Sequence, residues 1–218
     1  DHNTEYKPAE LGYVVDEDFS SKAIGHEGLI FLGYGISDRL AIEFEAAVIK
    51  ETLYKSSDDP SAMPSKLEES GLGDVEGQIR WRWNKESDKK PEVFSYFETV
   101  LPLQKDRVMI GTQDWEFKLG SGVIKGFQWG TMTVRLAFEY DRSERKTEMG
   151  EFAVEYLRRV SNFFRFGFFV EGAQDEIVFI SDLQFHVSKH AFIRVNNGFG
   201  ITPKATDYAP EFGVLFHF

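Results

Sequence analysis

The sequence predicts an all-β protein, a 12-stranded antiparallel transmembrane β-barrel with short turns at one end and longer loops at the other. Three observations predict this fold class. Apolar and polar side chains alternate along nearly the whole chain. The alternating stretches are about as long as a tilted strand needs to cross a bilayer. The connections between them alternate between tight and long. Residues 1–218 are therefore expected to form one domain.

The alternation is clear in the middle of the chain, where Val134, Leu136 and Phe138 share one parity and Arg135 and Glu139 share the other. A period of two means a strand with one apolar and one polar face. From the first residue to the last, the pattern predicts strands near residues 9–19, 26–36, 39–53, 73–84, 91–103, 114–126, 129–141, 150–160, 163–173, 176–188, 191–202 and 208–218.

The connections differ between the two ends of these strands. Tight links are expected at residues 37–38, 127–128, 161–162 and 189–190, and a longer, charged link at 85–90. The remaining links are generally longer and polar, the longest running from residue 54 to 72, with a short exception near residues 174–175. Outer-membrane barrels show this asymmetry, because their turns are periplasmic and their loops extracellular. An even strand count then places both termini on the short-turn side, with residues 1–8 as a periplasmic tail or a plug in the lumen.

The composition excludes several classes of protein. Asp and Glu number 36 and Lys and Arg number 25, so the formal net charge is −11. Nucleic acid is not expected as a partner, because binding it requires clustered basic residues. Apolar residues make up 42% of the chain, which is too many for a disordered protein. Cysteine is absent, which excludes a disulfide scaffold, a thiol nucleophile and a thiolate metal site.

Aromatic residues are abundant, with 21 Phe, 8 Tyr and 4 Trp, and many fall near the ends of predicted strands. Aromatic belts at both interfaces are expected of a membrane barrel, because amphipathic rings favour the headgroup level. A soluble β-sandwich or barrel also alternates, but its aromatic residues would scatter through the core. The first residues lack the features of a signal peptide, so either the chain never had one or it is a mature sequence. We expect the second, a mature outer-membrane protein after signal-peptide removal.

Four short stretches support a more specific interpretation: residues 34–40 at the first tight turn, 71–74, 98–102 and the terminal 213–218. Together they resemble the outer-membrane barrels of the phenol-degradation meta-pathway family, a set of transporter-like proteins. The resemblance implies a lipid-embedded barrel that takes up small, often hydrophobic or aromatic molecules. It also implies that the terminal aromatic residues Phe216 and Phe218 form a signal read by the outer-membrane assembly machinery.

If the apolar parity faces lipid, the other parity faces the lumen. The candidates for lining a solute path on that parity are Glu76, Arg80, Arg82, Glu98, Glu116, Lys118, Arg135, Glu139, Glu155, Arg165, Asp182, His186 and Arg194. The same parity includes Glu43, Glu45 and Glu171. Most of these side chains are expected to fill a narrow interior with ion pairs. Arg80 and Arg82 are expected to form a cross-strand charge ladder with the glutamates of their own and adjacent strands.

The predicted function is passive uptake of a small-molecule solute through an outer-membrane channel, without covalent chemistry, cofactor or metal. Because acidic residues outnumber basic ones among the lumen candidates, a cation or a neutral solute is favoured over an anion. One alternative is a structural barrel with a plugged lumen that docks another envelope protein. Another is an outer-membrane lipid hydrolase, for which His186 and Ser188 share a face but have no obvious orienting acid.

Overall fold

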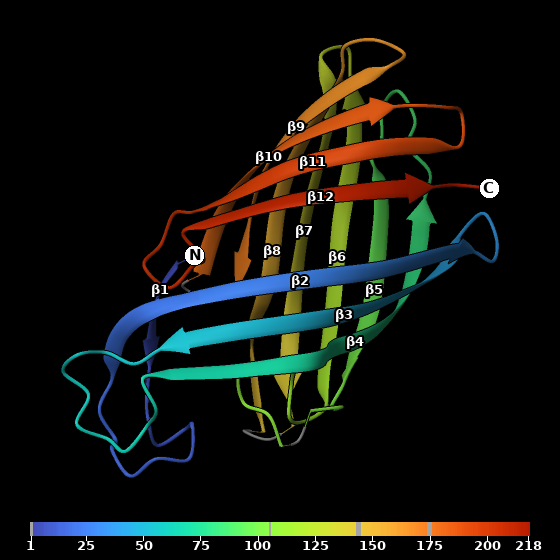
Figure 1. The fold of residues 1–218 in the computed structure, drawn as a ribbon. Coiled ribbons are helices and arrows are strands. Elements are labelled where there is room, and N and C mark those ends of the chain that lie inside the picture. The colour runs from blue at the N-terminus through green and yellow to red at the C-terminus, as the bar shows by residue number, and fades with distance from the viewer. Residues whose placement is uncertain (1, 105, 143–144, 174–175) are drawn as a thin grey trace. The chain divides into compact units, whose positions relative to one another are not determined.

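A computed structural model describes residues 2–104, 106–142, 145–173 and 176–218, which contain one twelve-stranded sheet (Figure 1). Neighbouring strands are antiparallel and follow chain order from the first to the last. They are β1 (His2–Tyr6), β2 (Phe19–Gly35), β3 (Leu40–Tyr54), β4 (Lys66–Asn84), β5 (Glu92–Leu101), β6 (Glu116–Phe127), β7 (Gly130–Asp141), β8 (Lys146–Arg159), β9 (Phe164–Ala173), β10 (Glu176–His186), β11 (Ala191–Gly200) and β12 (Tyr208–Phe216). The predicted all-β class and strand number are confirmed. The described part of the chain has no helix long and apolar enough to span a membrane.

The first strand does not lie where the alternation predicted it. Residues 9–18 form a link rather than a strand, and β1 is formed instead by residues that were expected to be a tail or a plug. Within the link, Gly12 has a φ of +89° and the Ala9 N–H donates to the Val15 carbonyl over 2.9 Å. The apolar residues of this segment therefore lie in turns, and in turns an alternating spacing of apolar residues does not indicate a strand.

The sequence pattern missed β1 because this strand pairs with β2 through backbone hydrogen bonds, which do not require apolar and polar residues to alternate. Tyr6 lies opposite Phe19 and His2 lies opposite Ala23, so β1 covers only the first part of β2. His2 therefore lies part-way along β2, not at the short-turn end that was predicted for both termini. Tyr6 is the buried anchor of this short strand.

β4 also begins earlier than predicted, at Lys66 rather than near residue 73. The long link between β3 and β4 consequently shrinks to residues 55–65. The added residues pair with the end of β3, with Lys66 opposite Tyr54. Their exposed face is mostly polar, so they lack the apolar parity that marks the rest of the strand.

The two faces of the sheet differ as the alternation predicted. On β7, Val134, Leu136 and Phe138 are 42%, 42% and 57% exposed, whereas Arg135 and Glu139 are half-buried. We call the face with these apolar side chains the apolar face, and the other the polar face. The connections keep the predicted asymmetry. Links at 36–39, 85–91, 128–129, 160–163 and 187–190 join strands at one end, and links at 7–18, 55–65, 102–115 and 201–207 join them at the other. The predicted short link at residues 174–175 lies outside the described residues.

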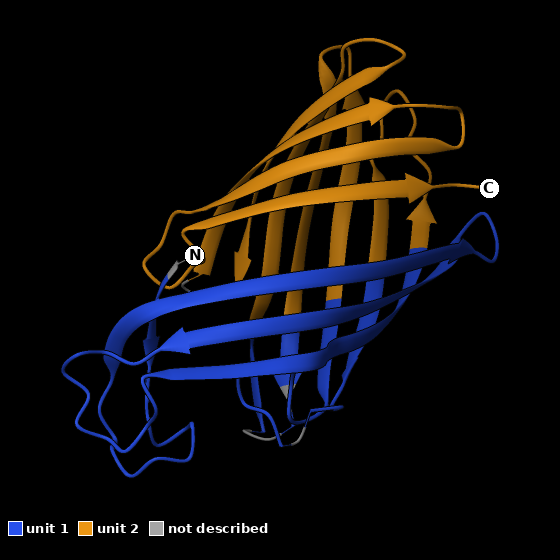
Figure 2. Cartoon of the chain, in the orientation of Figure 1, with its two compact units in different colours: residues 1–81, 96–119, 139–148 blue, residues 82–95, 120–138, 149–218 orange. Residues whose placement is uncertain are grey.

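The chain divides into two compact units, each assembled from segments that are separate in sequence (Figure 2). Unit 1 comprises residues 1–81, 96–119 and 139–148, and unit 2 comprises residues 82–95, 120–138 and 149–218. Unit 1 contains a small apolar core of Tyr6, Ala23, Leu53 and Met63. Unit 2 buries Ala137, Ala153 and Phe169 on its polar face, together with the charged Asp182.

Candidate functional site

The predicted lumen residues all lie on the polar face and are half-buried or buried. They belong to eight successive strands: Glu76, Arg80 and Arg82 on β4, Glu98 on β5, Glu116 and Lys118 on β6, Arg135 and Glu139 on β7, Glu155 on β8, Arg165 on β9, Asp182 and His186 on β10, and Arg194 on β11. Strand pleating alone explains why they share a face. Their contacts differ between the two units, and these contacts determine what each group can do.

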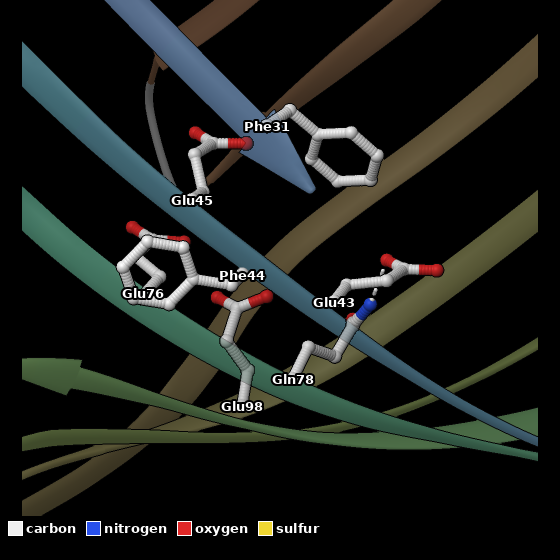
Figure 3. A pocket seen from close by; sticks show the side chains of 7 residues that line it. All are labelled: Phe31, Glu43, Phe44, Glu45, Glu76, Gln78 and Glu98. Carbon is white, nitrogen blue, oxygen red and sulfur yellow. Dashed lines mark hydrogen bonds between the residues drawn. The ribbon is translucent and has the colours of Figure 1, made fainter. Parts of the chain in front are cut away.

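In unit 1 the polar face carries a pocket lined by acidic side chains (Figure 3). It encloses about 240 Å³ of space, part of which is open to solvent. Four glutamates, one glutamine and two phenylalanines from β2 to β5 line it: Phe31, Glu43, Phe44, Glu45, Glu76, Gln78 and Glu98. The wall contains no lysine, arginine or histidine. Such a surface favours cations or neutral molecules over anions.

Glu43 and Glu98 of the pocket contact polar side chains of neighbouring strands. The Gln78 amide donates to Glu43, and the Lys118 ammonium lies 3.2 Å from Glu98 Oε1. The Lys118 and Glu98 side chains retain only 11% and 16% of their exposure. This pair joins β5 to β6, so it fixes Glu98 at the border of the pocket.

In unit 2 the polar face is built around a buried carboxylate. Asp182 is fully buried, and its Oδ1 accepts a hydrogen bond from Arg194 Nε over 2.6 Å. Its Oδ2 accepts a second from Gln184 Nε2 over 2.8 Å. The Arg194 guanidinium also lies 5.7 Å from the centre of the Phe169 ring. A buried charge is tolerated only when it is paired and hydrogen-bonded in this way.

A second network in unit 2 spans three strands. Arg135 on β7 lies 3.8 Å from Glu155 on β8 and 3.4 Å from Glu171 on β9. A third pair joins β4 to β5, where Arg82 lies 3.3 Å from Glu92. The expected ladder of Arg80 and Arg82 with Glu76, Glu98 and Glu116 stays a prediction, and Arg82 meets Glu92, a residue that the predicted set omitted. Glu92 was missed because register, which no residue pattern states, determines which charges lie opposite each other.

The remaining candidates occupy the polar face without forming one centre. Arg80, Glu116, Glu139 and Arg165 are half-buried there. The His186 ring lies 5.3 Å from the Phe192 ring. Ser188, which was weighed as a hydrolase nucleophile, accepts a hydrogen bond from the His190 N–H over 3.1 Å and lies in the 187–190 turn. In the described ranges, no group of three or more His, Asp and Glu side chains is arranged to hold a metal ion.

Of the two terminal aromatic residues, Phe216 lies on the apolar face of β12. Phe216 pairs with Ala191 of β11 and is 66% exposed, and Phe218 follows the strand fully exposed. Aromatic rings at the same end of other hairpins are similarly placed, for example Phe127 and Trp129, which stack with centroids 4.7 Å apart. Exposed aromatic rings at strand ends are suited to the headgroup region of a bilayer.

Comparison with solved structures identifies the architecture. An outer membrane channel from Pseudomonas putida F1 matches with a TM-score of 0.58, over 98% of this chain and 88% of that one. The chain has the fold of an outer-membrane β-barrel. Sequence identity over the match is 13%, so the likeness shows the fold alone. No family model and no curated protein matches the sequence.

Proposed function

We propose that this protein is a passive outer-membrane channel that carries small solutes along the polar faces of its strands. The observation that supports it most directly is the division of one barrel fold into two faces. Exposed Val, Leu and Phe side chains occupy the apolar face, where lipid would solvate them. Charged side chains from eight strands occupy the polar face, which is the lumen side in such barrels.

The acidic pocket of unit 1 supports a preference among solutes. Four glutamates line it without a basic residue in the wall, so cations and neutral solutes are favoured. Phe31, which lies opposite Glu45, adds an aromatic ring on the same face. This ring provides apolar contact for small hydrophobic or aromatic molecules, the substrate class that the family resemblance implies.

Conductance and osmotic-swelling measurements test the proposed channel function. Purified protein, folded in detergent and inserted into planar bilayers, should give discrete conductance steps with a cation-selective reversal potential in a salt gradient. Proteoliposomes should swell in isotonic solutions of small neutral sugars. A folded protein that neither conducts nor permits swelling would remove the channel function.

A structural barrel with a closed lumen is the second candidate. The observation that favours it is the density of the polar face, where Asp182, Lys118 and several apolar residues are buried. A closed barrel would give neither conductance nor swelling while remaining folded. Cross-linking in intact cells should then join the barrel to a specific envelope protein, which can be identified after purification of the cross-linked product.

We also propose that the protein performs no covalent chemistry. The hydroxyl of Ser188 caps a turn through the His190 N–H, and His186 packs beside Phe192. Incubation of the folded protein with phospholipid vesicles should release no fatty acid. Release that disappears in Ser188→Ala or His186→Ala would establish the hydrolase instead.

The C-terminal strand supports a role for Phe216 and Phe218 in assembly at the outer membrane. Deleting Phe218, or changing it to Ser, should lower the folded, heat-modifiable band in outer-membrane fractions. Refolding in detergent should change little, because one interfacial ring is a small part of the total stability. Normal assembly of the deletion variant in cells would contradict this role.

A further inference from the structure

One long link of unit 1 folds back onto the strand beside it. The link is 102–115, between β5 and β6, and its residues 107–112, which we call the clamped segment, lie against residues 69–74 of β4. This part of β4 belongs to the polar face: Gly71 lies opposite Ile49, which has the same parity as Glu43 and Glu45. The clamped segment therefore covers polar-face surface rather than extending into solvent.

Two carboxylates of β4 hold the backbone of the clamped segment. The Met109 N–H donates to Glu69 Oε2 over 2.9 Å, and the Thr112 N–H donates to Asp74 Oδ1 over 2.6 Å. Bonds from a backbone N–H to an ionised carboxylate are shorter and stronger than neutral ones. The two anchors lie near the two ends of the segment, so they fix it along the strand instead of at a single point.

The strand is shaped to receive the segment. Arg107 donates to the Ser70 carbonyl, and a Cβ on Gly71 would clash with the Arg107 guanidinium and contact Ile110. Ile110 is only 1% exposed. The absence of a side chain at Gly71 thus creates the space in which the segment packs.

A β-bulge in β4 lies at the second anchor. Ala46 pairs with Val75 and Val48 with Leu72, so that Gly73 and Asp74 together face one residue of β3. Bulges commonly re-aim a side chain, and here Asp74 is the side chain that reaches the segment.

The backbone of the segment is also specialised at this point. Gly111 has a φ of +69°, a backbone conformation that residues with a side chain rarely adopt. A Cβ at this position would lie 3.1 Å from the Gly73 carbonyl carbon. Any larger residue at position 111 would therefore strain the backbone and push the segment away from β4.

The segment is joined to the other long links of unit 1. Met109 packs against the core that contains Tyr6 and Met63, to which residues of the 7–18 link also contribute. The Tyr6 hydroxyl donates to Asp59 Oδ2 over 2.8 Å and accepts from the Ser56 N–H over 2.9 Å. Three links from the long-link end therefore form one packed body over the polar face of β2 to β4.

We infer that the clamped segment is the constriction of the channel, which sets the largest solute that can pass and places the Arg107 guanidinium beside the path. This inference rests on the proposed channel function and names the element that limits it. Its physical basis is that an anchored loop on a lumen face narrows the passage by its own volume and contributes its charge there.

Release of the clamp tests the inference. In Glu69→Ala/Asp74→Ala both anchors are lost, and the segment should leave the polar face. Single-channel conductance in planar bilayers should rise above that of the parent, and proteoliposomes should swell in larger sugars that the parent excludes. Gly111→Val displaces the segment without changing charge and should act in the same direction. Arg107→Ala should increase the cation preference.

The matched control is Glu10→Ala/Asp106→Ala, which removes two carboxylates from exposed link positions. It should behave as the parent does, and a heat-modifiable band should confirm that every variant is folded. If the parent conducts and the two release variants keep its conductance and sugar limit, the segment is not the constriction and the channel function stands. If the parent is silent and the release variants conduct, the segment is a constriction that closes the path. If no variant conducts, the channel function itself is wrong.

Discussion

Charged side chains have different surroundings on the polar faces of the two units, although the same alternating pattern places charges on both. In unit 2, Asp182 is fully buried against Arg194, and Arg135 lies within 4 Å of two glutamates. In unit 1, four glutamates surround a solvent-open pocket whose wall contains no basic residue. A charge that is paired and fully dehydrated maintains the structure, whereas a carboxylate in the wall of a solvent-open pocket lies within reach of a solute even where it also has a protein partner. The comparison shows that a shared face does not imply a shared role.

The largest effect is expected from a substitution that breaks the buried ion pair of unit 2. Arg194→Met leaves the Asp182 carboxylate buried without its cation and should cost about 3–5 kcal/mol of unfolding free energy. Lys118→Met in unit 1 should cost less, because Glu98 keeps 16% of its exposure and can be hydrated. Urea unfolding in lipid vesicles measures both.

The double variant Arg194→Met/Asp182→Asn controls for the loss of packing. It should recover much of the lost stability, because no uncompensated charge remains. Equal costs for Arg194→Met and Lys118→Met would show that the two polar faces are energetically alike.

The apolar face should show no such difference between units. Ile42→Arg in unit 1 and Leu136→Arg in unit 2 replace side chains that are each 42% exposed on that face. Each should cost about 2–4 kcal/mol near the bilayer midplane. Thr133→Arg, on the polar face of the same strand as Leu136, should cost less in the same vesicle assay. An equal cost at positions 133 and 136 would refute the assignment of faces.

A smaller effect concerns ion preference. Glu43→Gln/Glu76→Gln removes two carboxylates from the open pocket of unit 1 and should lower the cation preference, measured as reversal potential in a salt gradient. Glu155→Gln in unit 2 should change it less, because that carboxylate lies beside Arg135. A larger shift for Glu155→Gln would reverse the roles assigned to the two faces.

The smallest effect is a pH dependence at the 85–91 link. The Gly126 N–H and the Lys125 ammonium hold the pKa of Glu86 below its usual range. A depressed pKa contributes stability that is present above the unfolded value and lost as the pH falls through the folded value. Acidification should therefore destabilise the parent more than Glu86→Gln, as measured by urea midpoints over a pH series. Asp88→Asn, in the same link, should retain the slope of the parent.

Alternation was sufficient to predict most strands because, in a barrel, lipid and lumen impose opposite polarity on successive side chains. The alternation failed to predict strands in regions where neither lipid nor lumen determines the polarity of the side chains. β1 is held by backbone bonds and one buried tyrosine, and the start of β4 is polar on its exposed face. The predicted site residues lie on the expected face, but their partners did not follow from the pattern. Glu92, Gln78 and Phe31 became recognisable only through register and the neighbouring strands.

The sequence by itself determined the fold class, the two faces and the asymmetry of the links, because each follows from local periodicity and turn chemistry. Only the tertiary structure decided which carboxylates are buried against a cation and which line an open pocket. It also decided that residues 107–112 lie on the polar face of β4, anchored by Glu69 and Asp74. These contacts join residues about 40 positions apart in the chain. Such contacts depend on register, a β-bulge and the space left by Gly71, and no short sequence pattern encodes that combination.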